Sequence, residues 1–419
     1  MPECRASTAV PVGPSVAVTV VGGGVAGVST VSALRRLGHT GPLVLVDAGG
    51  TLHDRPPLSK AYLAGTAVED ELALHPGEWF TEHGVEVLQG VRAVSLDPDA
   101  ATLVLSDGGV LTADAVVLAQ GAAAHLPPVE GIRFARVLRT LDDARALREQ
   151  LRPGARLVVV GAGLVGAEVA ATAGSLGVTV TLVDPDPVPL AGVVGQDVAR
   201  LLHDDHARHG VHVVLDAMER ITPVAGTGGV VVRLCGGREI EADVVLVATG
   251  MSPVDDLARL SGLVVADGGG VVVDRYQRTS APAVLAVGDG TRVRRDDGIV
   301  APPGGHWDAA RLDGETAAAV VLGQEPPARG APWFWTDRYG RHVEVVGDPT
   351  AGSRTVRRGT IGDGPATVLG WQDGILTGAV SVDDPRTARA VRRLVDRRVV
   401  VDPDALVDPA SDLRALLRG

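Results

Sequence analysis

A single lysine stands out in a chain that otherwise takes its positive charge from arginine. Lysine and arginine together number 39, and Lys60 is the only lysine among them. Pro56 and Pro57 precede it closely, and because proline fixes the backbone they present Lys60 from a stiff loop. An ammonium group held in this way stabilises negative charge that develops on a reacting group beside it. We therefore predict that Lys60 is a catalytic residue rather than an ordinary loop lysine.

Two glycine-rich turns, each between an apolar strand-like run and a helical stretch, have the spacing G-x-G-x-x-G. Their glycines are Gly22, Gly24 and Gly27 in the first turn, and Gly161, Gly163 and Gly166 in the second. This spacing lets backbone N–H groups approach a pyrophosphate at a helix N-terminus. An acidic residue follows each turn, Asp47 and Asp184, where it can bind ribose hydroxyls. The pattern predicts two dinucleotide sites, and a carboxylate there favours NADH because it repels the 2′-phosphate of NADPH.

Two dinucleotides in one chain indicate hydride transfer from a nicotinamide to a flavin, with the protein supplying orientation and electrostatics. Glu168 follows the second turn directly, and we predict that it is a catalytic residue that pairs with Lys60 or orients the nicotinamide. The alternative is an ordinary acidic residue near a helix N-terminus. Asp289 lies between two glycines after an apolar run. We predict that it accepts a hydrogen bond from a flavin ribityl hydroxyl; the alternative is an ordinary turn aspartate.

Tryptophan supplies further candidates, because aromatic residues make up only 3% of the chain. Trp307 follows His306, and Trp333 and Trp335 lie two residues apart. Core packing is the ordinary role of a tryptophan, whereas packing against a flavin ring is the functional alternative. We predict flavin contact for Trp307 and Trp335, with Trp335 as a catalytic residue, and core packing for Trp333.

Duplicated strand–helix–strand units are predicted to position these groups. The first comprises a strand over 16–21, a helix ending before Gly38 and a strand over 43–46; the second comprises a strand over 157–160, a helix over 167–176 and a strand over 178–183. Continuous apolar runs of this kind are typical of parallel strands buried on both faces. Segments 113–121 and 242–250 match each other, and each is a strand ending in a glycine turn, at Gly121 and Gly250. The fold class is therefore α/β, with two Rossmann-like dinucleotide-binding domains and, after a proline-rich linker, a separate C-terminal α+β domain.

The composition excludes several other classes of protein. Cys4 and Cys235 are the only cysteines, which excludes a disulfide framework, a cysteine-rich zinc site and a CxxC redox pair. We interpret Cys235 as structural. The net charge of −12 makes nucleic acid an unsuitable partner. His203, His206 and His209 recur every third residue in a polar stretch, which predicts a solvated helical face and no metal site.

The uncharged stretch from Ala6 to Leu34 invites a membrane or signal-peptide interpretation. A strand followed by a tight glycine turn explains it better, because the stretch contains several glycines, two prolines and polar residues. We therefore expect no membrane association, a disordered leader over residues 1–14 and a cytoplasmic protein.

From about residue 16 to 400 the sequence resembles a known family, the FAD-dependent, NADH-linked ferredoxin reductases of oxygenase and cytochrome P450 electron chains, most specifically at three segments. These reductases belong to the pyridine nucleotide-disulfide oxidoreductases but lack the redox cysteines. The segments are 55–63, 304–307 and 332–337. The resemblance implies a glutathione-reductase-like fold. It also implies an FAD domain over 15–125 and 254–328, an NAD domain over 126–253 and a C-terminal reductase domain over 329–419.

The resemblance also assigns contacts by position. FAD contacts fall on Ala26, Asp47, Arg55, Lys60, Ala93, Asp289 and Trp307, with Trp335 near the isoalloxazine; nicotinamide contacts fall on Gly163, Val165, Glu168, Asp184 and Gly250. The sequence departs from the family where His125 follows three alanines in place of an arginine, and where Gly305 replaces a frequent glutamate. The implied reaction passes hydride from NADH to FAD and then single electrons to a [2Fe–2S] ferredoxin.

Local basic patches are the predicted ferredoxin surface, since ferredoxins are acidic. The arginines are Arg292, Arg294 and Arg295, and Arg386, Arg389, Arg392 and Arg393. Other functions require different residues. NADH peroxidase or coenzyme A-disulfide reductase chemistry needs a cysteine near His53 or Asp54, and none is there. NADH oxidase activity and a non-catalytic flavin- or NADH-binding scaffold or sensor both remain alternatives.

Overall fold

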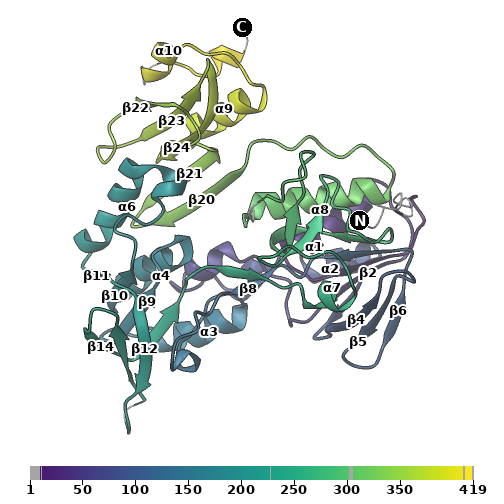
Figure 1. The fold of residues 1–419 in the computed structure, drawn as a ribbon, viewed down its shortest axis with the longest axis horizontal. Helices are drawn as coiled ribbons and strands as arrows, with labels where there is room; N and C mark the ends of the chain where they lie inside the picture. Colours follow the sequence, from purple (N-terminus) through teal and green to yellow (C-terminus); the bar gives the residue numbers. More distant parts are fainter. Residues whose placement is uncertain (1–9, 11, 227, 302–304, 409–410, 418–419) are drawn as a thin grey trace. The chain divides into compact units, whose positions relative to one another are not determined.

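The computed structural model describes residues 10, 12–226, 228–301, 305–408 and 411–417 (Figure 1). Most of the predicted leader, and Gly304 of the family segment, lie outside these residues. The chain forms two compact units. The first comprises the chain up to Asp54 with Glu69–Ala123 and Met251–Arg329; the second comprises Arg55–Val68, Ala124–Gly250 and the chain from Gly330.

The first unit is built on a parallel five-stranded sheet in the order β18-β7-β1-β2-β3. Its strands are β1 (Val18–Val21), β2 (Leu43–Asp47), β3 (Glu86–Gln89), β7 (Ala115–Leu118) and β18 (Val284–Ala286). Strands β1, β7 and β18 are buried throughout, as expected for parallel strands covered on both faces. The order reverses beside β1, between β2 and β7, and ligands of open α/β sheets bind at such a switch point.

Helices α1 (Val25–Arg36) and α8 (Trp307–Val321) pack side by side in the first unit (Figure 1). A Cβ on Gly314 of α8 would lie 2.5 Å from the carbonyl oxygen of Ala26, so this close crossing needs glycine. The other elements of the first unit are smaller: α2 (Gly77–Glu82), α7 (Asp256–Leu260), η2 (Glu69–Leu72), η4 (Gly288–Gly290), β4 (Ala93–Asp97), β5 (Thr102–Leu105), β6 (Val110–Thr112), β16 (Met251–Pro253), β17 (Val271–Val273) and β19 (Thr291–Val293). Strand β8 (Ala122–Ala124) lies where the chain passes from the first unit to the second.

The second unit contains a parallel four-stranded sheet in the order β11-β10-β9-β15. Its strands are β9 (Arg156–Val160), β10 (Thr179–Asp184), β11 (His212–Leu215) and β15 (Val244–Val247). The order again reverses beside the first strand, β9. The second unit also contains η1 (Pro56–Ser59), η3 (Ile132–Phe134), α3 (Leu141–Gln150), α4 (Leu164–Ser175), α5 (Ala191–Val194), α6 (Gln196–Arg208) and an antiparallel sheet of β12 (Met218–Pro223), β13 (Val230–Leu234) and β14 (Glu239–Ala242). Cys235 is exposed in the hairpin between β13 and β14.

An antiparallel sheet in the order β20-β21-β24-β23-β22 completes the second unit. Its elements are β20 (Trp333–Arg338), β21 (Arg341–Gly347), β22 (Arg354–Arg358), β23 (Ala366–Gln372), β24 (Ile375–Val382), α9 (Pro385–Asp396), α10 (Pro403–Val407) and η5 (Ala415–Leu417). Helix α9 buries Ala388, Val391 and Leu394 against this sheet. This segment contains both helices and antiparallel strands, as predicted for an α+β domain.

The predicted α/β fold class is confirmed, and element boundaries differ by a few residues. The helix expected from residue 167 begins at Leu164, because the turn already ends at Gly163, which occupies the N-cap position. Gly38 and Gly177, expected at the ends of the two helices, both have positive φ, as is typical of the residue after a helix.

Candidate functional site

The three glycines of each turn meet different surroundings. Gly22 and Gly161 come first and have positive φ; a Cβ on them would lie 2.3 and 2.4 Å from the carbonyl oxygens of Ala119 and Ala248. The last glycine, Gly27 or Gly166, approaches the first so closely that a Cβ would lie 1.8 or 1.9 Å from its carbonyl oxygen.

The middle glycine of the second turn is the opposite case. A Cβ on Gly163 would meet no protein atom within 4 Å, so the protein fold alone does not require glycine there. A glycine with open space around it is expected where a ligand comes close to the backbone, so Gly163 stays a predicted contact. Neither α1 nor α4 has an acidic residue in its first turn or a side-chain cap, and both N-termini therefore suit an anion.

The acids after the turns occupy equivalent places. Asp47 ends β2 and accepts a 2.7 Å hydrogen bond from the backbone N–H of Gly23. Asp184 ends β10 and accepts a 2.7 Å hydrogen bond from that of Ala162. Each carboxylate is half-buried and fixed beside its turn, where it retains capacity for further hydrogen bonds.

Lys60 follows the short helix η1, whose first two residues are Pro56 and Pro57. The backbone N–H of Lys60 donates to the carbonyl of Pro57, and Thr172 Oγ1 of α4 donates to the carbonyl of Ser59. These contacts fix the loop on α4. Arg55, a predicted flavin contact, occupies the N-cap position of η1 and is half-buried.

Glu168 joins three elements of the second unit. Its carboxylate accepts hydrogen bonds from Ser59 Oγ at 2.5 Å and Thr336 Oγ1 at 2.6 Å, and lies 3.2 Å from Lys60 Nζ. The side chain of Glu168 is only 6% exposed. A buried carboxylate is tolerated when it is paired and hydrogen-bonded, and this one has both kinds of partner. The pairing of Lys60 with Glu168, expected from the sequence, is present.

A second carboxylate reaches Lys60 from β20. Asp337 Oδ2 lies 3.3 Å from Lys60 Nζ, and its other oxygen contacts His342 Nδ1 at 2.6 Å. His342 Nε2 in turn lies 3.3 Å from Glu344 Oε1. Partial burial lowers the pKa of His342, but the hydrogen bonds and charges of Asp337 and Glu344 outweigh it and raise the pKa above its ordinary value.

Both tryptophans of β20 lie on the same face as Asp337. Trp335 lies under the ammonium of Lys60, with 5.5 Å between Nζ and the ring centroid, within range of a cation–π interaction. Trp333 stacks on Trp335 at 4.9 Å and donates a 2.7 Å hydrogen bond to Glu344 Oε2. Trp333 is half-buried, so the prediction of core packing was only partly right.

In the first unit, two predicted flavin residues lie near the start of α8: Trp307 begins this helix, and Asp289 lies in η4, which contacts it. Trp307 Nε1 donates a 2.8 Å hydrogen bond to Asp54 Oδ1. Asp289 lies in η4, whose Gly288 donates its N–H to the buried Asp313 of α8. Burial lowers the pKa of His306, against the opposing charge of Asp289.

The remaining predicted cofactor contacts differ in their exposure and backbone conformation. Ala26 and Ala93 are buried, and Val165 is exposed. Gly121 and Gly250 follow β7 and β15 with positive φ. The backbone of His125, which replaces the family arginine, is tied to Thr249 and Gly250. These residues stay predicted contacts.

Two sequence interpretations are wrong in detail. Arg292 was assigned to a docking surface, but it is 9% exposed and donates to the carbonyl of Thr291. The histidines of α6 were predicted to lie on a solvated face, yet His206 is 0% exposed. It contacts Tyr339 Oη at 2.8 Å, because α6 packs against the sheet that contains β20. Burial and then the charge of Arg338 lower the pKa of His206 to about 3.

Sequence reasoning missed the polar partners Ser59, Thr336, Asp337, His342 and Glu344. For His342 and Glu344 the sequence offers one signal, the short connection between the two strands. Tyr339 and Gly340 both have positive φ and join β20 to β21 by a two-residue turn, and such a turn fixes the register. That register places His342 opposite Asp337 and Glu344 opposite Trp335.

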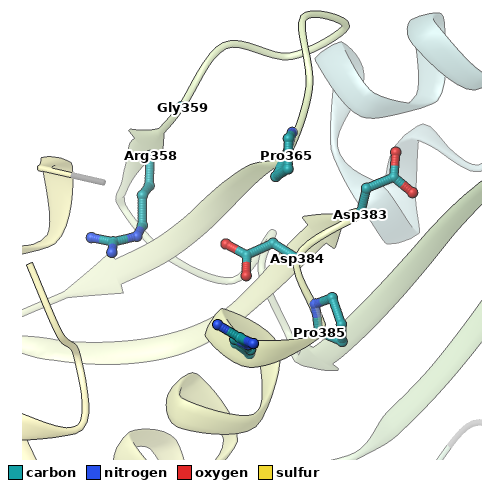
Figure 2. Close-up of a pocket in the computed structure, with 7 residues that line it drawn as sticks. Arg358, Gly359, Pro365, Asp383, Asp384 and Pro385 are labelled. Atoms are coloured by element: carbon teal, nitrogen blue, oxygen red, sulfur yellow. The ribbon is translucent and has the colours of Figure 1, made fainter. Parts of the chain in front are cut away.

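A cavity of about 320 Å³ opens in the C-terminal sheet domain (Figure 2). Its lining is Arg358, Gly359, Pro365, Asp383, Asp384, Pro385 and Arg386. Arg358 is committed to the carbonyl oxygens of Asp408 and Ser411. In Figure 2 the carboxylates of Asp383 and Asp384 point in different directions. No predicted cofactor or catalytic residue lines the cavity, so we do not assign the reaction to it.

Comparisons with known proteins agree with this geometry. The model of the pyridine nucleotide-disulphide oxidoreductase family matches residues 16–312, and that of the reductase C-terminal family matches residues 333–417. The chain belongs to the pyridine nucleotide-disulphide oxidoreductase family. The resemblance and the fold inferred from the sequence are thereby confirmed.

Similar members of this family are named as components of oxygenase systems. The chain is 35% identical over 405 residues to the benzene 1,2-dioxygenase system ferredoxin–NAD(+) reductase subunit of Pseudomonas putida, covering 96% of this chain and 97% of the relative. It is 36% identical over 408 residues to the ferredoxin reductase component of chlorobenzene dioxygenase of Cupriavidus sp. strain PS12, with 96% and 97% covered. The crystal structure of a covalent putidaredoxin reductase–putidaredoxin complex matches with a TM-score of 0.90 at 30% identity, covering 96% of this chain and 98% of that chain.

Among the described residues, no helix combines the length and apolar character needed to cross a membrane.

Proposed function

We propose that this chain is an NADH-dependent ferredoxin reductase that carries FAD. The observation that carries the proposal is the Lys60–Glu168 pair, which is held next to the second glycine turn without a cysteine. The similarity to ferredoxin–NAD(+) reductase components over nearly the full chain supports it. So does the similarity to a reductase whose structure was determined with its putidaredoxin.

The residues present fit two dinucleotides. The first turn, with Asp47 and Asp289 in the same unit, fits FAD; the second turn, with Asp184, fits NADH. Gly163 leaves room for a pyrophosphate, and the N-terminus of α4 offers unpaired N–H groups to it. We infer that NADH is preferred to NADPH because Asp184 would repel a 2′-phosphate.

FAD, when bound, accepts hydride from NADH and releases electrons one at a time. The protein's own residues orient the reactants and provide charge. Lys60 supplies a positive charge for the negative charge that develops during the transfer. Glu168 holds that ammonium in place through its ion pair and through Ser59 and Thr336. With three partners already on its carboxylate, Glu168 acts as a positioning residue.

We further propose that the partner is a [2Fe–2S] ferredoxin that docks on arginines of α9. Arg386, Arg389 and Arg393 are exposed along the outer face of this helix, opposite its buried apolar residues. In a chain with a net charge of −12, such a local positive stripe steers an acidic partner at low salt. Arg294 and Arg295 of the first unit are also exposed, and they stay a separate predicted patch.

The experiment that tests the reaction is anaerobic mixing of the purified protein with NADH in a stopped-flow instrument. We expect flavin absorbance at about 450 nm to bleach rapidly with NADH and much less with NADPH. Added ferredoxin should then be reduced in preference to oxygen. Fast oxygen consumption without ferredoxin reduction would favour an NADH oxidase. A protein that does not take up FAD would favour the non-catalytic scaffold.

The docking proposal has its own test. Charge reversal at Arg389 and Arg393 should slow ferredoxin reduction at low salt, with flavin bleaching by NADH unchanged. Arg238, exposed in the hairpin between β13 and β14, is the matched control. Equal ferredoxin rates in the α9 variant and the wild type would exclude this helix as the docking surface.

A further inference from the structure

One imidazole ring connects Lys60 to the tryptophan pair of β20. In the β20–β21 hairpin, Asp337 pairs with His342 and Trp335 pairs with Glu344. Side chains of paired residues lie on the same face of a sheet. The ring nitrogens of His342 accordingly face two carboxylates, Asp337 at 2.6 Å and Glu344 at 3.3 Å.

Both contacts are hydrogen bonds only when the ring is protonated. A neutral imidazole has one N–H donor, whereas the imidazolium donates from both nitrogens. Glu344 is 7% exposed at its side chain, and its other oxygen accepts from the indole N–H of Trp333. Among the described residues, the ion-pair contact of Glu344 comes from His342, so protonated His342 is the positive charge that balances its burial.

Each carboxylate has a second contact on its far side. Asp337 contacts Lys60 at 3.3 Å, and Glu344 holds Trp333, which stacks on Trp335. We propose that His342 is a positioning residue of the reductase, whose single proton holds Asp337 against Lys60 and Glu344 against Trp333. The inference rests on the proposed function, and it adds a pH-sensitive group that neither the family resemblance nor the relatives' names assign.

Loss of the proton has a defined consequence. The neutral ring keeps one N–H, and the shorter contact, to Asp337, is the one it retains. Glu344 is then a nearly buried carboxylate whose partner is the indole N–H of Trp333. Because burying an unpaired charge is costly, the side chain of Glu344 moves toward water, and the Trp333 contact changes with it.

Other charged groups near His342 are already engaged. Lys60 and Glu168 act on it through Asp337. Arg392 of α9 lies 5.8 Å from the Trp333 ring. Asp383 accepts the backbone N–H of His342 and lies near Arg341. Arg341 is turned to Asp205. The carboxylates that contact the ring itself are therefore Asp337 and Glu344.

The decisive experiment is an NMR pH titration of the holoprotein labelled with ¹³C and ¹⁵N at histidine and tryptophan. The ring signal of His342 is assigned with H342Q, and the indole N–H of Trp333 with W333F. We expect His342 to titrate above the ordinary histidine range of about 6.5, and the Trp333 signal to move with the same midpoint. E344Q and D337N should each lower the His342 midpoint by about one unit. H212Q, at an exposed position of β11, should leave both signals unchanged.

Kinetics supply the second readout. The rate of flavin bleaching by NADH should change across the His342 midpoint in the wild type, and that pH dependence should be absent in H342Q. A Trp333 signal that does not follow His342 would overturn the proposal, and so would a pH profile unchanged in H342Q. If NADH fails to bleach the flavin at all, the proposed function is wrong, while the NMR titration still reports on the His342 bridge.

Discussion

The two glycine-turn regions have the same backbone design and different side-chain surroundings. In both, the first strand lies at the reversal of the strand order, and the first and last glycines make the same close approaches. Two residues beyond the last glycine the regions diverge. The first has Ser29, half-buried in α1, whereas the second has Glu168, buried among Lys60, Ser59 and Thr336. The shared part suits a nucleotide, and the divergent part suits the reaction.

The packing of the two helices explains the divergence. Helix α1 lies against α8 so closely that Gly314 has no room for a side chain, and the ion pair that joins the two helices, Arg36–Glu315, is more exposed than Lys60–Glu168. Helix α4 instead contacts η1 and β20, and both bring polar side chains to Glu168. A second difference lies inside the turns. Ala162 of the second turn corresponds to Gly23, where a Cβ would lie 2.1 Å from the side chain of Leu52.

The largest expected effects come from the glycine that both regions share. In G27A and G166A the added Cβ meets a backbone oxygen at 1.8 and 1.9 Å, so the helix must move away from the turn. We expect purified G27A to contain little or no flavin. G166A should retain flavin but bind NADH at least about 100-fold more weakly. Flavin content and NADH titration measure the two effects.

G192A is the matched control, because a Cβ there meets nothing within 4 Å. Circular dichroism of all three variants separates cofactor loss from unfolding. Flavin loss in G166A with retention in G27A would reverse the assignment of the two turns.

The next largest effect is on the rate of hydride transfer, which we expect to depend on side chains of the second region and not on those of the first. K60A removes the ammonium beside Glu168 and Asp337, and we expect it to slow hydride transfer by about 100-fold. E168Q keeps a hydrogen-bonding side chain but removes the ion pair, and a loss of roughly tenfold is expected. S29A in the first region is the control, with an expected rate close to that of wild type. Single-turnover bleaching by NADH measures all three, and a wild-type rate in K60A would remove Lys60 from the mechanism.

The sequence predicted the backbone of both regions better than the side chains around them. Gly22, Gly27 and the closing Asp47 are predictable because their spacing has a local cause, the turn itself. The Lys60–Glu168 contact joins residues more than a hundred positions apart, and it was expected only as one of two roles for Glu168. Thr336 and Ser59 gave no such signal, because a hydroxyl near a chain turn is common.

Burial of His206 could not be deduced from its own segment. Its neighbours Asp204 and Asp205 make the stretch polar, which predicts solvent exposure. In the structure Asp205 is 3% exposed and pairs with Arg341, a residue of β21. The polar residues of α6 therefore serve a buried contact whose partners come from a distant part of the chain. Helical periodicity cannot distinguish such a polar contact surface from a solvated one.

The burial of His206 predicts that acid lowers the free energy of unfolding. The pKa of His206 is lowered to about 3 in the folded chain, whereas the unfolded chain binds its proton below about pH 6.5. As the pH is lowered between those two values, the free energy of unfolding should therefore fall by about 1.4 kcal/mol for each pH unit. H206F should flatten this part of the profile.

Denaturant unfolding of wild type and H206F from pH 4 to pH 8 measures the difference. Burial also lowers the pKa of His203, so H203Q should flatten the stability profile in the same direction but to a smaller extent. Parallel profiles for wild type and H206F would show that His206 is not neutral in the folded protein. His342 has the opposite sign, because its raised pKa gives stability below about pH 6.5 that is lost as pH rises through the folded value.

The smallest effects come from the two acids that close the regions. Asp47 and Asp184 each accept a backbone N–H of their own turn at 2.7 Å, and an asparagine can accept the same bond through its amide oxygen. D184N should therefore leave the turn intact and remove only the charge that opposes a 2′-phosphate. We expect the preference for NADH over NADPH to fall by about tenfold, with flavin content unchanged. D47N should leave that preference unaltered and weaken FAD retention slightly. A preference that changes in D47N but not in D184N would mean that the first turn, not the second, holds the nicotinamide dinucleotide.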